Sequence, residues 1–260
     1  MHPILLKIGS FSLTSYGFFV ALGFAAGMFY VSFQAKKKSP QIISQDDLFS
    51  LLFYTIIAAV VGARALFVIA EYPEMIINNP LEMFAIWEGG LVFYGGFIGS
   101  ILCAFFYIKK KKLNVAKVFD LFAPAVALGH FLGRIGCFMA GCCNGKPTDM
   151  PWAIVFNNPD SLSLIKGIPV HPVELYESFT NLILFIVLHN YNKKNHKDGL
   201  AIAAYLLAYS IYRFIFEFFR GDYRGEPILG LSTSQFISIF VFIAGIIIVY
   251  RVNRNGKNKI

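Results

Sequence analysis

Residues 48–70 read LFSLLFYTIIAAVVGARALFVIA, an apolar run in which Arg64 is the only charged residue. A helix needs about 20 such residues to cross the hydrocarbon core of a bilayer. The rest of the chain has the same character, because 57% of its 260 residues are hydrophobic and only 15% are charged. Soluble domains carry charge on about a quarter of their residues. These properties predict an all-α integral membrane protein.

Seven apolar runs are long enough to span a bilayer, and they cover residues 12–33, 48–70, 90–108, 118–138, 173–189, 199–219 and 234–250. Lysine-rich blocks lie between or after them, at residues 36–38, 109–117, 193–197 and 251–259. Cytoplasmic loops carry an excess of lysine and arginine. The blocks alternate with the runs, which predicts seven transmembrane helices with the N-terminus outside and the C-terminus in the cytoplasm. The net charge of +8 then reflects topology, and we expect no nucleic-acid partner.

The connections at the predicted outer face are the long ones. Residues 71–89 and 139–172 contain proline, asparagine, glycine and aromatic residues, whereas the inner connections are short. We therefore expect one integral domain over residues 1–260, with an elaborated extracytoplasmic loop or head segment at residues 139–172. No internal repeat of the kind found in many transporters is evident.

Ionisable side chains within membrane spans are costly and usually face a cavity or a partner. In the predicted topology they gather at the outer helix ends, at Arg64, Glu88, Tyr94, Arg134, Glu174, Glu177, Arg213 and Glu217, while Asp120 alone lies at an inner end. Residues 213, 217, 220 and 224 are spaced to form one charged helical stripe of three arginines and a glutamate. Two interpretations remain: a helix end that snorkels to the interface, or, together with Arg64 and Arg134, a shared anion site. Arginine suits phosphate because its planar guanidinium donates hydrogen bonds in a fork.

Two further segments have both a structural and a functional interpretation. Residues 88–99 place five glycines around Tyr94, which favours close helix packing as much as a binding site. The fourth run ends in GRIGCFMAGCCNG, residues 133–145, with thiols at Cys137, Cys142 and Cys143. This spacing is poor for zinc, so we expect no metal site and interpret the thiols as a disulfide or as packed free cysteines.

Several segments together resemble the prolipoprotein diacylglyceryl transferase family of the bacterial cytoplasmic membrane. The resemblance covers nearly the whole chain, through Ser15-Tyr16-Gly17, Gly62-Ala63-Arg64, the segment from Gly89 to Gly96, Gly133-Arg134-Ile135-Gly136, His171-Pro172, Leu175-Tyr176-Glu177, the segment from Arg213 to Arg220, and Leu231-Ser232 with Gln235. The order and spacing of these motifs fit the predicted topology.

The resemblance implies an enzyme that transfers the diacylglyceryl group of phosphatidylglycerol to the lipobox cysteine of a prolipoprotein and releases glycerol phosphate. The implied partners are membrane lipids and the signal-peptide and lipobox region of the precursor, and no cofactor is implied. By correspondence the catalytic residues are Tyr94, Arg134, Arg213 and Glu217. The substrate-binding residues are Tyr16, Arg64, Gly95, Gly96, Gly133, Gly145, Glu177 and Arg220.

The chain departs from the family pattern at the third and fourth runs. In much of that family a histidine, the proposed base for the acceptor thiol, occupies the position of Tyr94. The family motif commonly has an asparagine where this chain has Cys137. Tyrosine has an ordinary pKa of about 10 against about 8.5 for cysteine, so a neutral tyrosine is a poor base. Either neighbouring arginines lower its pKa, or Tyr94 only donates a hydrogen bond while Glu88 or water takes the proton.

Two other functions fit a membrane protein of this composition. A thiol oxidoreductase would use the three clustered cysteines, but the usual C-x-x-C spacing is missing. A lipid or anion transporter needs polar groups that continue across the membrane, and here they stop in the outer half, apart from Asp120.

Overall fold

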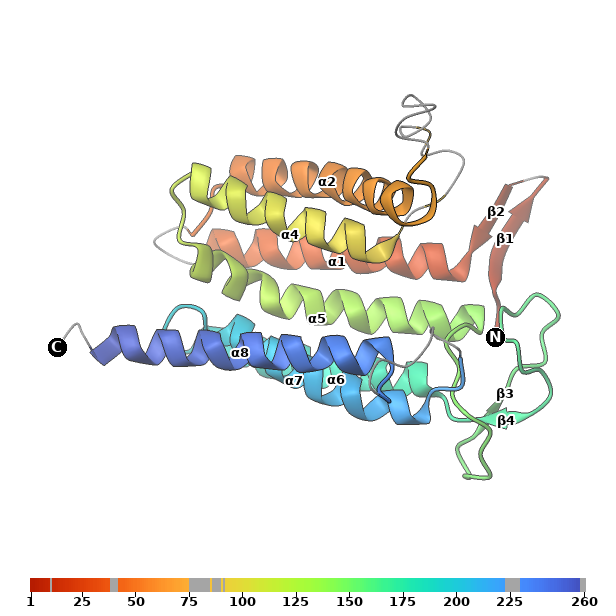
Figure 1. Ribbon diagram of the computed structural model, residues 1–260. Helices are drawn as coiled ribbons and strands as arrows, with labels where there is room; N and C mark the ends of the chain where they lie inside the picture. The colour runs from red at the N-terminus through yellow and green to blue at the C-terminus, as the bar shows by residue number, and fades with distance from the viewer. Residues whose placement is uncertain are drawn as a thin grey trace. The chain divides into compact units, whose positions relative to one another are not determined.

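The computed structural model describes residues 1–9, 11–37, 42–74, 85, 90, 92–222 and 230–257. The part of the chain that it describes is mainly helical (Figure 1). Its α-helices are α1 (Ser15–Lys37), α2 (Gln45–Glu71), α4 (Phe93–Lys110), α5 (Val115–Ala140), α6 (Val173–Lys193), α7 (Leu200–Phe216) and α8 (Thr233–Lys257). A 3₁₀ turn, η3 (Glu217–Phe219), follows α7 directly.

Each predicted span coincides with one of these helices. The prediction of a helical membrane protein is therefore confirmed. Within the described ranges, five segments are long and apolar enough to cross a membrane: α1, α2, α5, Leu200–Phe219 and Thr233–Arg254 of α8. The other two predicted spans correspond to α4, which ends in two lysines, and α6, which carries a buried polar face. The count of seven spans stays a prediction.

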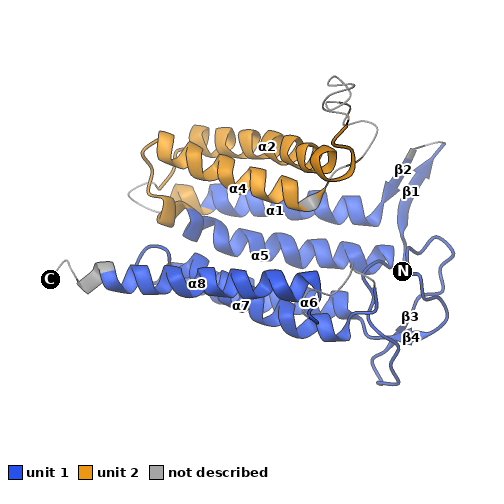
Figure 2. Cartoon of the chain, in the orientation of Figure 1, with its two compact units in different colours: residues 1–33, 119–260 blue, residues 34–118 orange. Residues whose placement is uncertain are grey.

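The chain divides into two compact units (Figure 2), residues 34–118 and the remainder. In the unit of residues 34–118, α2 and α4 pack backbone against backbone. Any larger residue in place of Gly96 or Gly99 would place its Cβ atom against the neighbouring helix. At Gly96 the Cβ would lie 2.9 Å from the carbonyl oxygen of Ala59, and at Gly99 it would lie 2.5 Å from the carbonyl oxygen of Ala58. A Cβ at Gly95 would collide with the carbonyl of Gly62. The glycines around Tyr94 thus serve close helix packing.

In the other unit, α5, α6 and α7 share an apolar core. Its buried members are Ala123, Ala127, Leu184, Leu188, Tyr205 and Tyr212. A Cβ at Gly23 would lie 3.1 Å from the carbonyl oxygen of Gly129, which shows how closely α1 approaches α5. Small residues at the crossings therefore let these helices meet at backbone distance.

Two short β-ribbons, which the sequence did not predict, extend one end of this unit (Figure 1). Strands β1 (Ile4–Ile8) and β2 (Phe11–Thr14) are antiparallel, as are β3 (Ile154–Val155) and β4 (Pro169–Val170). The amide of Asn158 donates to the carbonyl of Met1, which ties the N-terminus to the segment at residues 139–172. The long connection predicted at the outer face thus has structure of its own.

Asp120 caps a helix. It is the one ionisable residue that the sequence placed at an inner helix end, away from the others. Its carboxylate accepts hydrogen bonds from the amides of Gly199 and Ile202, at 2.6 and 2.8 Å, at the start of α7. A carboxylate at a helix N-terminus satisfies free N–H groups and complements the helix dipole. This structural role removes the feature that suggested a polar path across the membrane.

We predict that Asp120→Ala lowers the free energy of unfolding by about 1 to 2 kcal/mol, the usual cost of losing an N-cap. Asp120→Asn keeps an acceptor and should lose less. Apparent melting temperatures in detergent measure the difference. A melting temperature unchanged in the alanine variant would contradict the capping role.

Candidate active site

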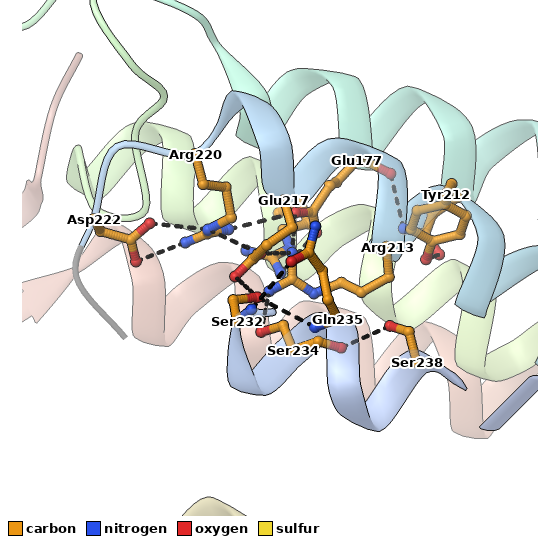
Figure 3. Close-up of polar contacts among 12 residues, drawn as sticks. Glu177, Tyr212, Arg213, Glu217, Arg220, Asp222, Ser232, Ser234, Gln235 and Ser238 are labelled. Atoms are coloured by element: carbon orange, nitrogen blue, oxygen red, sulfur yellow. Dashed lines mark hydrogen bonds and ion pairs between the residues drawn. The ribbon is translucent and has the colours of Figure 1, made fainter. Parts of the chain in front are cut away.

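One buried carboxylate, that of Glu177, lies among three arginines. Figure 3 shows it with two of them, Arg213 and Arg220. Its oxygens lie 2.6 Å from Arg134 Nη2, 3.3 Å from Arg213 Nη1 and 3.4 Å from Arg220 Nη1. The Glu177 side chain is only 2% exposed. A buried carboxylate is stable only when it is paired and hydrogen-bonded, and here three guanidinium groups share that task.

The network draws on three helices that are distant in the sequence. Glu177 lies on the buried face of α6, together with Glu174, Ser178 and Asn181 at helical spacing. Arg134 lies near the end of α5, and Arg213 lies in the last turn of α7. The packing of α5, α6 and α7 therefore sets the spacing of the charged groups.

The charged stripe predicted along the sixth span is only partly formed. The α-helix ends at Phe216 and tightens into η3, after which Arg220 adopts an extended conformation with ψ of 142°. Glu217 still pairs with Arg213 at 2.8 Å and lies 3.7 Å from Arg220. Arg224, the last predicted member of the stripe, lies outside the described residues.

The start of α8 supports Glu217 and Arg213. Ser232 and Gln235 form a reciprocal capping box, in which each side chain accepts a hydrogen bond from the backbone amide of the other. The Ser232 hydroxyl also donates to Glu217 Oε1 at 2.9 Å, and Arg213 Nη2 donates to Ser234 Oγ at 2.8 Å. Helix capping thus brings two hydroxyls to the ionic network.

The charges of this network balance. Arg220 forms a bidentate pair with Asp222, with both donor distances 2.8 to 2.9 Å. Three arginines therefore meet three carboxylates, those of Glu177, Glu217 and Asp222. The site holds its guanidinium groups in fixed positions and is not a simple excess of positive charge.

Arg134 differs from the other two arginines in accessibility. Its side chain is 21% exposed, against 6% for Arg213 and 2% for Arg220. Its ion-pair partner among the described residues is Glu177. Arg134 is the guanidinium best able to meet a ligand.

Gly145, predicted to bind substrate, occupies a crossing of three backbone segments. Its amide donates to the carbonyl of His171, and it forms an isolated antiparallel bridge with Arg220. A Cβ at Gly145 would lie 2.5 Å from the His171 carbonyl oxygen and 2.9 Å from that of Phe219. This crossing fixes the backbone of Arg220 and hence its side chain.

Tyr16 and Gly133 lie in the same unit as the network. Tyr16, on α1, is 48% exposed and interacts electrostatically with Arg134 and the three clustered cysteines. A Cβ at Gly136 would lie 3.4 Å from the Tyr16 backbone, so α1 crosses α5 beside the site. Gly133 precedes Arg134 on α5 in open surroundings, with nothing within 4 Å of an added Cβ.

Four predicted site residues belong to the unit of residues 34–118. Arg64 is buried on α2, with its guanidinium 5.4 Å from the ring centroid of Phe67. Tyr94 is 42% exposed at the start of α4. Gly95 and Gly96 face α2, and their role in substrate binding stays a prediction. Glu88, the alternative base, lies outside the described residues.

The structure brings three cysteines together where α5 ends. The sulfur atoms of Cys137, Cys142 and Cys143 all lie within 4.8 Å of one another, and none of the three forms a disulfide. Hydrogen bonds with Cys137 and Cys142, reinforced by the charge of Arg220, lower the pKa of the Cys143 thiol. The cluster therefore borders the arginine network.

Sequence reasoning missed the polar partners outside the family motifs. Asp222 holds Arg220, and Ser234 holds Arg213. Tyr212 donates to Asn181, whose amide donates to the backbone carbonyl of Glu177. The capping pattern from Ser232 to Gln235 was a readable signal for the start of α8, but nothing in it indicated a bond to Glu217.

The chain is similar to known proteins over almost its whole length. A family model described as prolipoprotein diacylglyceryl transferase matches residues 3–251. The chain is 37% identical to the phosphatidylglycerol–prolipoprotein diacylglyceryl transferase of Clostridium tetani, over 99% of this chain and 100% of that protein. It is 37% identical to the protein of that name from Bordetella parapertussis, covering 94% and 93% of the two chains. The second such transferase of Clostridium perfringens is 36% identical, over 100% and 98%.

We predict that Glu177→Gln lowers the free energy of unfolding by about 3 to 5 kcal/mol, because three guanidinium groups then lose their shared buried counter-charge. Asp222→Asn is a matched control, since Asp222 is 24% exposed and pairs with Arg220 at the more exposed edge of the network. It should cost about 1 kcal/mol or less. Thermal unfolding in detergent compares the two variants, and equal losses would contradict a central role for Glu177.

Proposed function

The chain belongs to the prolipoprotein diacylglyceryl transferase family, and we propose that it transfers the diacylglyceryl group of phosphatidylglycerol to the lipobox cysteine thiol of a prolipoprotein. The observation that carries the proposal is the arginine network around Glu177. An accessible Arg134 backed by buried arginines is suited to a lipid phosphate, which is the group that must leave in this reaction.

The reaction is a displacement at carbon. The cysteine sulfur attacks the glycerol carbon that carries the phosphate ester, so that a carbon–sulfur bond forms as the carbon–oxygen bond breaks. The electron pair of the broken bond goes to the phosphate oxygen, which leaves as glycerol phosphate, and the thiol proton goes to a base or to water. Negative charge grows on the phosphate, where fixed guanidinium donors stabilise it.

Each predicted site residue has a defined part in this proposal. Arg134 binds the phosphate directly, and Arg213 supports it from the more buried side. Glu217 orients Arg213, and Glu177 holds the three arginines at fixed spacing, so that little reorganisation is needed when charge develops. Tyr16 and Gly133 line the lipid side, while Gly145 and Arg220 shape the loop side of the site. Arg64, Tyr94, Gly95 and Gly96 receive the acceptor peptide.

The proposed setting is the bacterial cytoplasmic membrane, with seven spans, the N-terminus outside and the C-terminus in the cytoplasm. The alternation of lysine blocks with apolar runs supports this topology. It puts the arginine network at the depth of the outer headgroups, where phosphatidylglycerol and a secreted precursor meet. The ribbons β1–β2 and β3–β4 then belong to the elaborated outer face of one integral domain.

The deciding experiment uses purified protein, vesicles containing phosphatidylglycerol and a precursor peptide with one lipobox cysteine. We expect the peptide to gain the mass of one diacylglyceryl group as glycerol phosphate appears. Arg134→Ala should lower the rate about 10²- to 10³-fold, the usual effect of removing one donor that stabilises developing charge. Arg134→Lys should recover little, because the ammonium lacks the guanidinium fork.

Arg251→Ala, an exposed arginine near the end of α8, is the matched control and should react at the wild-type rate. Vesicles of neutral phosphatidylcholine should give no product. If Arg134→Ala and wild type lipidate the peptide equally, the phosphate assignment is wrong. If wild type produces no lipidated peptide from phosphatidylglycerol, the function itself is wrong.

Tyr94→Phe keeps the ring and removes the hydroxyl. We expect it to lower the transfer rate about 10²- to 10⁴-fold, the usual contribution of a positioned acid or base. Initial rates at matched amounts of folded enzyme measure this effect, with Tyr72→Phe, an exposed tyrosine after α2, as control. Full activity in Tyr94→Phe would exclude the hydroxyl from the mechanism.

A further inference from the structure

The three cysteines beside the arginine network form a compact sulfur cluster. The Cys137, Cys142 and Cys143 sulfurs lie within 4.8 Å of one another in every pairing, and none of the three is joined in a disulfide. The fourth cysteine, Cys103, lies on α4 in the other compact unit. The transfer reaction proposed above uses a thiol supplied by the substrate, and it leaves this cluster without a role.

The backbone after α5 is shaped to bring the sulfurs together. Gly141 has φ of +77°, and Cys143 has φ of +70°. A left-handed conformation is common for glycine but unfavourable for a residue with a Cβ atom. Two such residues within three positions turn the chain back on itself and return Cys142 and Cys143 to Cys137, one helical turn before the end of α5.

The sulfur spacing suits a single thiophilic metal ion. A Zn²⁺–thiolate bond of about 2.3 Å in tetrahedral geometry implies sulfur–sulfur separations of about 3.8 Å, so sulfurs already within 4.8 Å need only a small adjustment. A disulfide would bond two sulfurs at about 2.05 Å and leave the third out. Soft thiolate ligands select Zn²⁺ or Cu⁺ over hard cations.

Buried charge beside the cluster points independently to a missing ligand. The Glu174 side chain is fully buried, and within the described residues neither of its carboxylate oxygens has a hydrogen-bond partner. It interacts electrostatically with Cys143, Arg220 and Arg134. An orphaned buried carboxylate is rare and commonly marks an absent water or ion.

The charges of the surroundings fit an occupied site. Three thiolates on one Zn²⁺ carry a net charge of −1, and Arg134 and Arg220 both interact electrostatically with Cys143. Three thiolates without a metal ion would repel one another. A cation among the sulfurs removes that repulsion and puts a positive ion near the unpartnered carboxylate of Glu174.

We propose that Cys137, Cys142 and Cys143 bind one thiophilic metal ion of the Zn²⁺ class at the end of α5, with Glu174 as the adjacent carboxylate. The site is separate from the phosphate-binding role of Arg134 and needs no assumption about the reaction. It gives the 133–145 segment a rigid anchor next to the arginine network.

The test is the metal content of the full-length protein, purified in detergent under reducing conditions without chelator and then dialysed against excess Zn²⁺ and against metal-free buffer. We expect about one Zn²⁺ per chain, the stoichiometry of a mononuclear thiolate site. Co²⁺ in place of Zn²⁺ should give thiolate-to-metal charge-transfer absorption. Cys142→Ser and Cys143→Ser should each reduce bound metal to background, whereas Cys103→Ser should keep the wild-type amount.

Three outcomes would overturn the proposal. Wild type could stay metal-free after Zn²⁺ dialysis, with three thiols that react freely with a thiol reagent. Mass spectrometry of the protein as purified could find a disulfide within the cluster. Cys142→Ser and Cys143→Ser could retain as much Zn²⁺ as Cys103→Ser, which would mean adventitious binding. Because wild type alone decides the first two outcomes, a variant that fails to fold does not obscure them.

Discussion

The site depends on a carboxylate that cannot be left alone in a low-dielectric interior. Glu177 is 2% exposed, and an unpaired charge so placed would cost several kcal/mol. Three arginines from α5, α7 and the segment after η3 compensate for that cost. Each arginine also depends on Glu177, because a guanidinium is itself expensive to bury. The ionic contacts therefore tie together segments that hydrophobic packing alone would hold with little specificity.

The backbone around the site serves this requirement. Ser232 and Gln235 cap α8, and the capping hydroxyl of Ser232 also donates to Glu217. Gly145 lets the strand-like segment at Arg220 approach the loop before α6 at backbone distance, which a Cβ would prevent. Helix α7 ends in a 3₁₀ turn at the point where Arg220 must leave the helix to reach Asp222. Local conformations that interrupt regular helices are thus concentrated around the arginines.

The sequence predicted the helices well, because a bilayer requires long apolar runs and each run became a helix. For the outer arginines it left two interpretations open, a helix end that snorkels to the interface or a shared site that includes Arg134 and Arg213, since ionisable residues in membrane spans face a cavity or a partner. The structure brings both arginines to Glu177. It did not predict that α7 would end at Phe216, because no glycine or proline stands at or directly after that residue. The β-ribbons were missed because their strands, two to five residues long, are too short to leave a clear periodic pattern.

The cysteine cluster shows the limit of arguments from spacing. Known zinc motifs pair their ligands at short regular intervals, and residues 137, 142 and 143 do not follow that rule. The rule assumes ordinary backbone conformations between the ligands, whereas a left-handed residue changes which side chains converge. Gly141 signals such a turn in the sequence, but the positive φ of Cys143 does not follow from its residue type. A cysteine held in an unfavourable conformation implies that surrounding interactions determine its position.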